Sequence, residues 1–315
     1  MARLTGTLAE LGEFGLIDAI TPLFSPREQV LLGPGDDTAV VRSGDSVLVS
    51  TDLLVEGRHF RRDWGTAIDV GHRAAAAAMA DVAAMGGRAT ALVVGLAAPG
   101  GLPAQWAYDL AAGMTAEAAA LDASVVGGDV TAADQVVIAV TVLGRSDHPP
   151  VTRGGAQVGD VVAVAGRLGW ASAGLAVLQR GNRSPRAVVD AYRRPQPPYD
   201  CGPQAAARAA TAMIDVSDGL LADLGHIARA SAVAIDIRSA DFTVAEPLEA
   251  VGAALGVDPL SFCLTGGDDH ALAATFPERV GLPKHWTAVG SVAAGSGVTV
   301  DGADYEDPPG HEHFR

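Results

Sequence analysis

The sequence predicts a two-domain protein of mixed α and β structure, on three observations. The chain has 315 residues, which is long for a single core and suits two domains of roughly 150 residues each. Apolar runs typical of strands alternate with segments of helical periodicity along its length. A stretch rich in Pro, Gly and Ser between residues 145 and 159 lacks apolar periodicity. We therefore place the domains at 1–150 and 151–315.

The first domain is expected to contain three helices and at least five strands. Apolar spacing predicts an opening helix over 8–21, which stops before a proline. An alanine-rich segment predicts a helix over 67–85, which ends at two glycines, and a third helix is expected over 103–121. Strands are expected at 30–41 (interrupted by GPGDD), at 47–54, and in the runs ATALVVGLAAP, ASVVGGD and QVVIAVTVLG.

The second domain repeats this mixed pattern. DVVAVAG predicts a strand, 170–178 a helix, and the proline-rich bend RRPQPPYDCGP leads into a helix that is expected to reach Met213. MIDVSDGLLADLGHIARAS passes from a strand end through a tight polar turn into a helix. AVAIDIRS then predicts a strand, and short β runs are expected near Leu272, Val289 and Val298.

Composition excludes several classes of function. A formal net charge of -15 disfavours binding to nucleic acid or to anionic lipid. The chain has two cysteines, Cys201 and Cys263, without a metal-binding spacing, and this fits a reducing compartment. No secretory signal and no apolar run of about 18 residues is present. We expect a cytoplasmic protein that neither spans nor binds a membrane.

The acidic charge favours magnesium if the ligand is a phosphate, because a cation must lie between the two negative partners. Five short segments place acidic residues beside glycine or a small hydroxyl side chain. Carboxylate oxygens, phosphate oxygens and water are the ligands that Mg²⁺ prefers. Each segment alone favours a simple turn, because Asp and Gly are common turn residues, whereas the recurrence favours a site. The segments are Gly35–Asp37, Ser50–Asp52, Gly127–Asp129, Asp215–Gly219 and Gly266–Asp269.

Asp81 gives separate support for a metal site. It lies in the predicted helix over 67–85 with only apolar residues three and four positions away. An unpaired carboxylate on such a face is costly to bury, so it must be exposed, or satisfied by a cation or by donors from elsewhere. We favour the metal.

Three further positions leave alternatives open. Ser217 or Asp218 could cap the helix that follows them, and the same helix N-terminus would also favour a phosphate. Arg153, in the glycine-rich TRGGAQVGD, could clamp phosphates or be solvated. His59, in EGRHF, fits a surface loop when taken alone.

These residues resemble a known family, the thiamine-monophosphate kinases. The family lies within a superfamily that includes aminoimidazole ribonucleotide synthetase, selenophosphate synthetase and a hydrogenase maturation protein. The resemblance covers nearly the whole chain, and its motifs stand in a specific order. They are LGEFGLIDAI, GPGDDTAVV, VSTDLLVEGRHF, MADVAAMGGRAT, VVGGDVT, TRGGAQVGD, MIDVSDGLLADLGHIARAS, LTGGDDHAL and GHEHF.

The resemblance implies a synthetase-like α/β (α+β) fold and an activity. The N-terminal α/β domains would pair in a homodimer to complete a β-barrel, and the C-terminal domain would complete the cleft for nucleotide and substrate. The implied reaction is ATP-dependent phosphorylation of thiamine monophosphate to thiamine diphosphate, the last step of thiamine diphosphate biosynthesis. Transfer would be direct and in line, assisted by several Mg²⁺ ions. No general base is needed, because a phosphate monoester is already anionic near neutral pH.

The resemblance also implies roles for individual residues. The implied magnesium ligands are Asp36, Ser50, Thr51, Asp52, Asp81, Asp129, Asp215 and Asp218. The implied ATP contacts are Gly128, Asp129, Arg153 and Ser217. The implied contacts to thiamine phosphate are His59, Asp268 and His311.

Two residues implied to contact the substrate depart from the family's usual pattern. The family usually has GGED where this chain has Gly266–Asp269, so the carboxylate at Asp268 is one methylene shorter. The family's ending commonly places Tyr or Trp before an acidic residue and HF, whereas this chain has His311. Both changes affect reach or stacking toward the substrate.

Two rival functions remain at this point. A sister ATP-dependent synthetase of the same superfamily would phosphorylate an amide oxygen, although the order of motifs speaks against it. Selenophosphate synthetase would need a reactive cysteine near the N-terminus, and the first cysteine here is Cys201. A non-catalytic, dimeric magnesium-nucleotide binder would keep the aspartates and release no ADP.

Overall fold

The computed structural model describes residues 4–24, 27–32, 40–42, 46–306 and 308–311. The chain forms two compact units of mixed α and β structure, which confirms the predicted fold class. The first unit consists of Met1–Val82 and Arg88–Arg145, and the second of Ala83–Gly87 and Ser146–Arg315. The division after Arg145 lies where the predicted linker begins, but the sequence did not indicate that residues 83–87 belong to the second unit. Among the described residues, no helix is long and apolar enough to cross a membrane.

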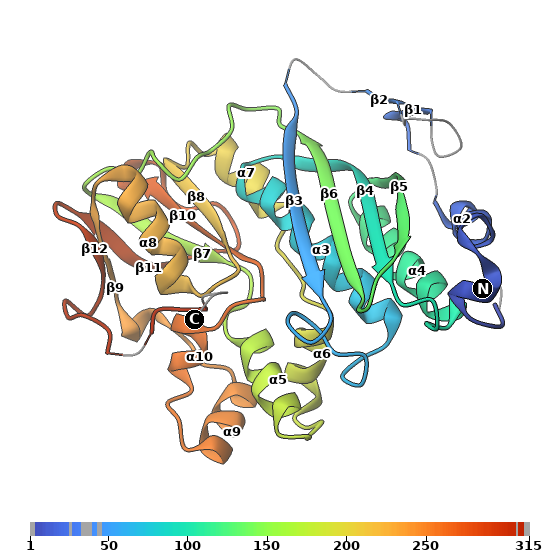
Figure 1. The fold of residues 1–315 in the computed structure, drawn as a ribbon. Helices are drawn as coiled ribbons and strands as arrows, with labels where there is room; N and C mark the ends of the chain where they lie inside the picture. Colours follow the sequence, from blue (N-terminus) through green and yellow to red (C-terminus); the bar gives the residue numbers. More distant parts are fainter. Residues whose placement is uncertain (1–3, 25–26, 33–39, 43–45, 307, 312–315) are drawn as a thin grey trace. The chain divides into compact units, whose positions relative to one another are not determined.

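A four-stranded sheet forms the centre of the first unit (Figure 1). Its order is β3–β6–β4–β5, with antiparallel pairs except for the parallel pair β4–β5. The edges of this sheet are therefore β3 and β5. The strands are β3 (Leu48–Val55), β4 (Arg88–Ala98), β5 (Ser124–Ala132) and β6 (Val137–Arg145).

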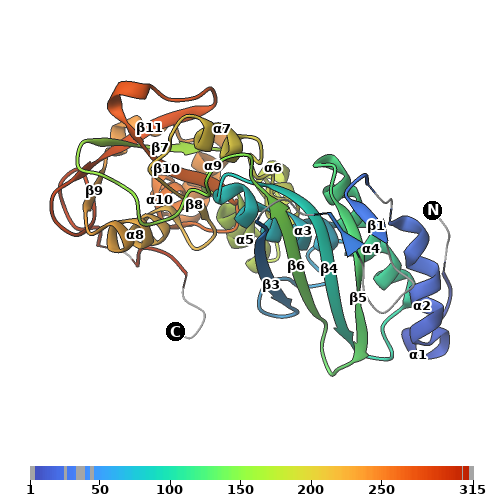
Figure 2. The ribbon, with the colours of Figure 1, turned by 90° about the horizontal axis from the view of Figure 1, so that it is seen from above.

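Two long helices, α3 (Ala67–Ala84) and α4 (Ala104–Ala120), cover one face of this sheet (Figure 2). They approach closely because glycines lie where they meet: a Cβ at Gly71 would lie 2.1 Å from the Leu110 carbonyl oxygen. The predicted opening helix is in fact two helices, α1 (Leu8–Leu11) and α2 (Glu13–Ile20). Gly12, with φ of 75°, separates them.

A 3-10 turn, η1 (Thr21–Leu23), follows α2, and two short strands pair with each other, β1 (Val30–Leu32) and β2 (Val40–Val41).

The opposite face of the four-stranded sheet leaves apolar side chains exposed. Val49 is 60% exposed, Leu53 58% and Val93 39%.

A six-stranded sheet forms the centre of the second unit, in the order β12–β9–β11–β7–β10–β8. Neighbouring strands are antiparallel except for the parallel pair β12–β9. Phe276 and Trp286 pack edge to face in its core, with ring centroids 5.2 Å apart. The strands are β7 (Asp160–Ala165), β8 (Ala212–Val216), β9 (Ala234–Ile237), β10 (Ala271–Pro277), β11 (Trp286–Ala293) and β12 (Gly297–Val300).

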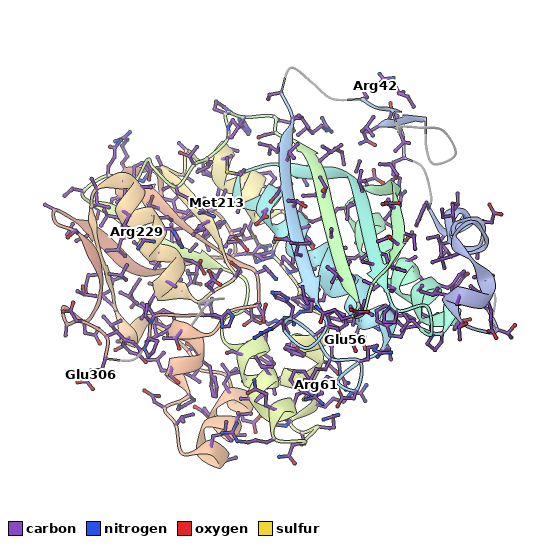
Figure 3. All side chains as sticks on the ribbon, viewed as in Figure 1. Arg42, Glu56, Arg61, Met213, Arg229 and Glu306 are labelled. Atoms are coloured by element: carbon purple, nitrogen blue, oxygen red, sulfur yellow. The ribbon has the colours of Figure 1, made fainter. Side chains whose placement is uncertain are left out.

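The helices of the second unit agree with the sequence only in part. The helix predicted to reach Met213 is wrong: α7 (Cys201–Ala207) ends earlier, and Met213 lies on β8 (Figure 3). The sequence did predict α5 (Trp170–Gln179) and α8 (Leu220–Ser231). It missed α6 (Arg186–Arg193), α9 (Glu246–Leu255) and α10 (Leu260–Thr265), and also the 3-10 turns η2 (Ser239–Asp241) and η3 (Glu278–Val280).

Candidate functional site

The β3 strand carries three of the predicted magnesium ligands, and its pleat divides them between two faces. Ser50 and Asp52 alternate with Val49 and Leu53 and lie on the half-buried, helix-covered side. Thr51 lies on the exposed side, where its Oγ1 is 3.1 Å from the hydroxyl oxygen of Thr141. The structure therefore brings the Ser50 and Asp52 side chains to one face and places the Thr51 hydroxyl on the other.

Asp81, on α3, meets β3 through Ser50. The Ser50 hydroxyl donates a hydrogen bond of 2.5 Å to Asp81 Oδ2. The Asp81 side chain is half-buried, and this hydroxyl from another element supplies one of the donors that its helix face lacks. A carboxylate and a hydroxyl oxygen at this separation form a compact pair of hard oxygen donors.

The segment Gly127–Asp129 lies within β5 and is not a turn. The turn interpretation is therefore wrong for this segment. Asp129 is exposed, and its Oδ1 accepts a hydrogen bond of 2.9 Å from the N–H of Val130. Gly128 faces Val94 of β4 so closely that a Cβ would lie 1.9 Å from the Val94 carbonyl oxygen. Strand packing alone thus requires glycine at 128.

Gly128→Ala is expected to lower the free energy of unfolding by about 2 kcal/mol or more, because the methyl group must push β4 and β5 apart. Gly127→Ala is the matched control, since a Cβ there meets nothing within 4 Å. Urea denaturation of both variants measures the difference. Equal destabilisation by the two alanines would contradict this account of Gly128.

The β3 group and Asp129 lie on the two edge strands of one sheet, separated by β6 and β4. Three strand spacings amount to roughly 14 Å in a flat sheet. One ion cannot bridge that width. Both groups could serve the same nucleotide only through a chain of phosphates and more than one ion.

His59 lies in the loop that follows β3. Its Nδ1 accepts a hydrogen bond of 3.0 Å from the backbone N–H of Val55, so the neutral ring carries its proton on Nε2. The side chain is half-buried, not a free surface histidine. Asp36, in contrast, lies outside the described residues.

In the second unit, the turn between β8 and α8 contains Ser217, Asp218 and Gly219. Gly219 is the N-cap of α8, with φ of 138° and no side-chain cap. The idea that Ser217 or Asp218 caps the helix is therefore wrong. The backbone N–H groups of Ser217, Asp218 and Gly219 instead donate to Asp223 Oδ2, at 3.1, 3.1 and 3.0 Å.

Two distant segments close on this turn through backbone hydrogen bonds. The N–H of Asp268 donates to the Ser217 carbonyl oxygen at 3.0 Å, and the N–H of His311 donates to the Asp218 carbonyl oxygen at 3.0 Å. A Cβ at Gly267 would lie 2.0 Å from the Ser217 carbonyl oxygen, so the approach requires glycine. The structure thus brings together four of the predicted site residues of this unit.

Asp215, on β8, lies just before the turn and is almost fully buried, with 5% exposed. Its Oδ2 is 3.2 Å from Nδ1 of His270. His270 and Asp268 are both in the left-handed region, with φ of 52° and 69°. Two such non-glycine residues in one turn store strain, which is common where a binding site fixes the backbone.

Asp269, between these two strained residues, is a buried carboxyl group that the sequence analysis did not single out. Its Oδ1 accepts a hydrogen bond of 3.0 Å from the N–H of Ala171 at the start of α5, and its Oδ2 has no hydrogen-bond partner among the described residues. Burial raises the pKa of Asp269 to about 7, against the opposing effects of the backbone N–H groups and of Arg167.

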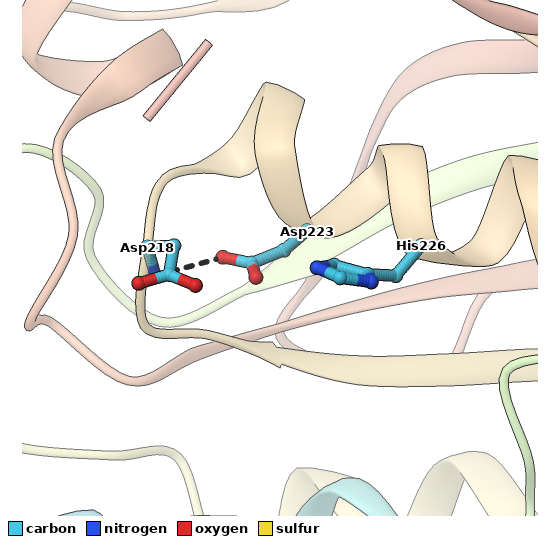
Figure 4. A group of neighbouring side chains, drawn as sticks. All are labelled: Asp218, Asp223 and His226. Carbon is cyan, nitrogen blue, oxygen red and sulfur yellow. Dashed lines mark hydrogen bonds between the residues drawn. The ribbon is translucent and has the colours of Figure 1, made fainter. Parts of the chain in front are cut away.

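Asp223 and His226 were also missed. They lie on α8 five and eight residues after Asp218 (Figure 4), and the three side chains point toward one another, with ligand atoms within 4.8 Å. Burial, with the nearby charge of Asp215, raises the pKa of Asp223 to about 7. Burial and the charges of Arg229 and Arg153 lower the pKa of His226. The available signal was an acid and a histidine at helical spacing beyond Asp218.

Arg153 lies beside the same helix. Its carbonyl oxygen accepts a hydrogen bond of 2.9 Å from the Ser231 hydroxyl at the end of α8. Its side chain is exposed. Arg229, also on α8 (Figure 3), is 3.1 Å from Nδ1 of His226. An exposed arginine and a carboxylate near one helix suit a phosphate that carries a metal ion.

Comparison with known proteins gives concordant results. The family model for AIR synthase related protein, N-terminal domain, matches residues 35–146, and the C-terminal domain model matches 157–301. A thiamine-monophosphate kinase from Mycobacterium tuberculosis (strain ATCC 25618 / H37Rv) is 46% identical over 318 residues, which cover 100% of this chain and 95% of that protein. A protein of the same name from Aquifex aeolicus (strain VF5) is 34% identical and covers 98% and 99%.

Solved structures agree. One described as AaThiL complexed with AMPPCP and TMP has a TM-score of 0.82 and 33% identity, and the match covers 100% of this chain and 99% of that one. A hydrogenase maturation protein HypE matches with a TM-score of 0.74 at 19% identity, over 95% and 98%. The latter likeness concerns the fold alone.

Proposed function

The chain belongs to the thiamine-monophosphate kinase family of AIR synthase related proteins, and we propose that it transfers the γ-phosphoryl group of ATP to thiamine monophosphate. The products are thiamine diphosphate and ADP. A phosphate oxygen of thiamine monophosphate forms the new P–O bond, and the bond between the γ-phosphorus and the β,γ-bridging oxygen of ATP breaks. The structural observation that carries the proposal is the convergence of Asp218, Asp268 and His311 on one turn.

The polar residues around this turn suit both reactants. Ser217 and Asp218 offer a hydroxyl group and a carboxylate for a nucleotide with its cation, and exposed Arg153 offers a guanidinium group for phosphate. Asp268 and His311 are assigned to the thiamine phosphate by the resemblance, and their backbone hydrogen bonds to this turn support the assignment. His59 belongs to the other unit, and its assignment to the substrate rests on the resemblance alone. The proposed acceptor is already an anion, so no side chain is required to remove a proton.

Magnesium is the proposed metal, because the available donors are hard oxygens. Ser50 Oγ and Asp81 Oδ2 lie 2.5 Å apart, and Asp218 offers a carboxylate just before α8. Bound magnesium would neutralise phosphate charge. Asp52, Thr51, Asp129 and Asp215 complete the proposed ligand set, and Asp36 belongs to it by resemblance. The separation of β3 from β5 supports more than one ion.

ADP release by the purified protein tests the function. With ATP and Mg²⁺ present, we expect release with thiamine monophosphate and no release with thiamine or without an acceptor. Appearance of thiamine diphosphate identifies the product. ADP release with a different acceptor would support the ATP site and refute thiamine monophosphate as the substrate. No ADP release with any acceptor would favour a non-catalytic binder.

We also propose a homodimer built on the open face of the four-stranded sheet. Val49, Leu53 and Val93 expose apolar surface there, β3 and β5 are free edges, and a second copy would cover both. The free, buried Cys201 and Cys263 suit the reducing cytoplasm proposed as its location.

Val93→Asp is expected to convert the dimer to a 31.9 kDa monomer, because a charge buried without a partner at an interface costs several kcal/mol. Light scattering coupled to size exclusion measures the mass. Val257→Asp is the matched control, since Val257 is similarly exposed, at 44%, on the second unit. A dimeric Val93→Asp variant would place the interface elsewhere.

A further inference from the structure

The carboxyl group of Asp223, on α8, accepts hydrogen bonds from the backbone of the Ser217–Gly219 turn that precedes this helix. One oxygen, Oδ2, accepts hydrogen bonds from the N–H groups of three successive residues, Ser217, Asp218 and Gly219, at 3.0 to 3.1 Å. The residue is 2% exposed. Three backbone donors therefore converge on one buried carboxyl oxygen.

This arrangement changes what the start of α8 can do. Free N–H groups at a helix N-terminus often bind phosphate. Here the three N–H groups of the turn are already occupied by Asp223, so a phosphate cannot use them without displacing that carboxylate. The turn can therefore contribute to nucleotide binding only through side chains, those of Ser217 and Asp218.

Asp223 has only one oxygen, Oδ1, left for a metal ion (Figure 4). Its Oδ2 is occupied by the turn. The neighbouring His226 has Nδ1 within 3.1 Å of the Arg229 guanidinium group, which can only donate, so the neutral ring carries its proton on Nε2. Neither ring nitrogen then presents a free lone pair. Of the two carboxyl groups, only that of Asp218 accepts no hydrogen bond from the backbone of the turn.

The carbonyl groups of the turn are fixed as well. Ser217 and Asp218 accept hydrogen bonds from the backbones of Asp268 and His311. The backbone N–H groups of the turn donate to Asp223, and its carbonyl groups accept from the two segments that carry Asp268 and His311. A change at Asp223 would thus move the side chains proposed for magnesium-ATP.

We propose that Asp223 is a positioning residue, which fixes the Ser217–Gly219 turn so that Asp218 and Ser217 are held ready for magnesium-ATP. The inference rests on the proposed function, because it takes the roles of Asp218 and Ser217 from there. Partners that orient a ligand carboxylate commonly contribute 10-fold to 100-fold to metal affinity or activity, as an order of magnitude.

Three variants separate position from charge. Asp223→Ala removes the acceptor and is expected to weaken Mg²⁺-dependent binding of AMPPCP at least about 10-fold. Asp223→Asn keeps an acceptor oxygen in place without the charge, and it is expected to recover most of that affinity. Asp223→Glu keeps the charge but displaces the oxygen by one methylene, so it is expected to bind as weakly as the alanine variant. Calorimetry with and without Mg²⁺ measures each affinity.

Asp160→Asn is the matched control. Asp160 is 4% exposed and its Oδ2 also organises a turn, accepting from the Gln157 N–H at 2.9 Å and from the Thr211 hydroxyl at 2.6 Å. This variant is expected to lose stability while the Mg²⁺ requirement of AMPPCP binding stays at the wild-type value. A thermal melt of every variant separates the two effects.

The outcomes are distinct. Wild-type affinity in Asp223→Ala, or wild-type affinity in Asp223→Glu with loss in Asp223→Asn, would overturn the positioning role. If Asp223→Ala does not fold, the contrast between Asn and Glu decides. These experiments measure nucleotide binding, so they remain valid if no acceptor is phosphorylated. Absence of phosphorylation would refute the proposed function, and the role of Asp223 would still be decided by the affinities.

Discussion

Asp129→Ala is expected to lower kcat for thiamine monophosphate phosphorylation by roughly 10³-fold or more, because a lost metal ligand removes several kcal/mol of transition-state stabilisation. The fold should remain intact. Asp129 is exposed on an edge strand, and its side chain accepts a hydrogen bond from the next residue in the chain, Val130. Little packing is lost when its side chain is removed.

Steady-state kinetics over a range of Mg²⁺ concentrations measures this effect, and circular dichroism checks the fold. Asp134→Ala is the control, since Asp134 is an exposed acid in the adjoining β5–β6 turn with no proposed role. Asp52→Ala should lose turnover as Asp129→Ala does. Retained turnover in either variant would refute its assignment as a ligand.

The strands and long helices could be predicted because their apolar periodicity is local. The alternation along β3 and the alanine-rich α3 are visible in the sequence, and the order strand end, turn and helix over β8 and α8 was predicted, although the start of β8 and the cap of α8 were not. The helices α6, α9 and α10 were missed because they are short and each begins at or beside a proline, where a local pattern is weak. Gly12 breaks the first helix through a backbone angle that residue spacing does not reveal.

The site was predicted as a list of residues, but its geometry depends on long-range contacts. Nothing in the sequence shows that His311 reaches the carbonyl group of Asp218, or that Ser50 bonds Asp81 across 31 positions. No role was predicted for Asp223. Its proposed role depends on the turn at Gly219, the N-cap of α8, because there the chain bends so that Asp223 Oδ2 meets the backbone N–H groups of residues 217–219.

Asp269 is expected to make the protein less stable as pH rises from 4 to 7. Burial raises the pKa of Asp269 from 3.8 to about 7, so in this range the folded carboxyl group holds a proton that the unfolded chain has lost. Stability then falls with rising pH. A shift of about three pKa units corresponds to roughly 4 kcal/mol at most.

Asp269→Asn isolates this effect, because asparagine keeps an oxygen for the N–H of Ala171 and cannot ionise. Urea denaturation of both proteins from pH 4 to pH 8, without nucleotide or Mg²⁺, gives the difference in unfolding free energy, from which groups far from Asp269 cancel. We expect the wild type to lose stability relative to the variant as pH rises, with most of the change complete near pH 7. A difference that does not vary with pH would mean that Asp269 is ionised throughout, and its buried Oδ2 would then need a donor beyond those that the described residues supply.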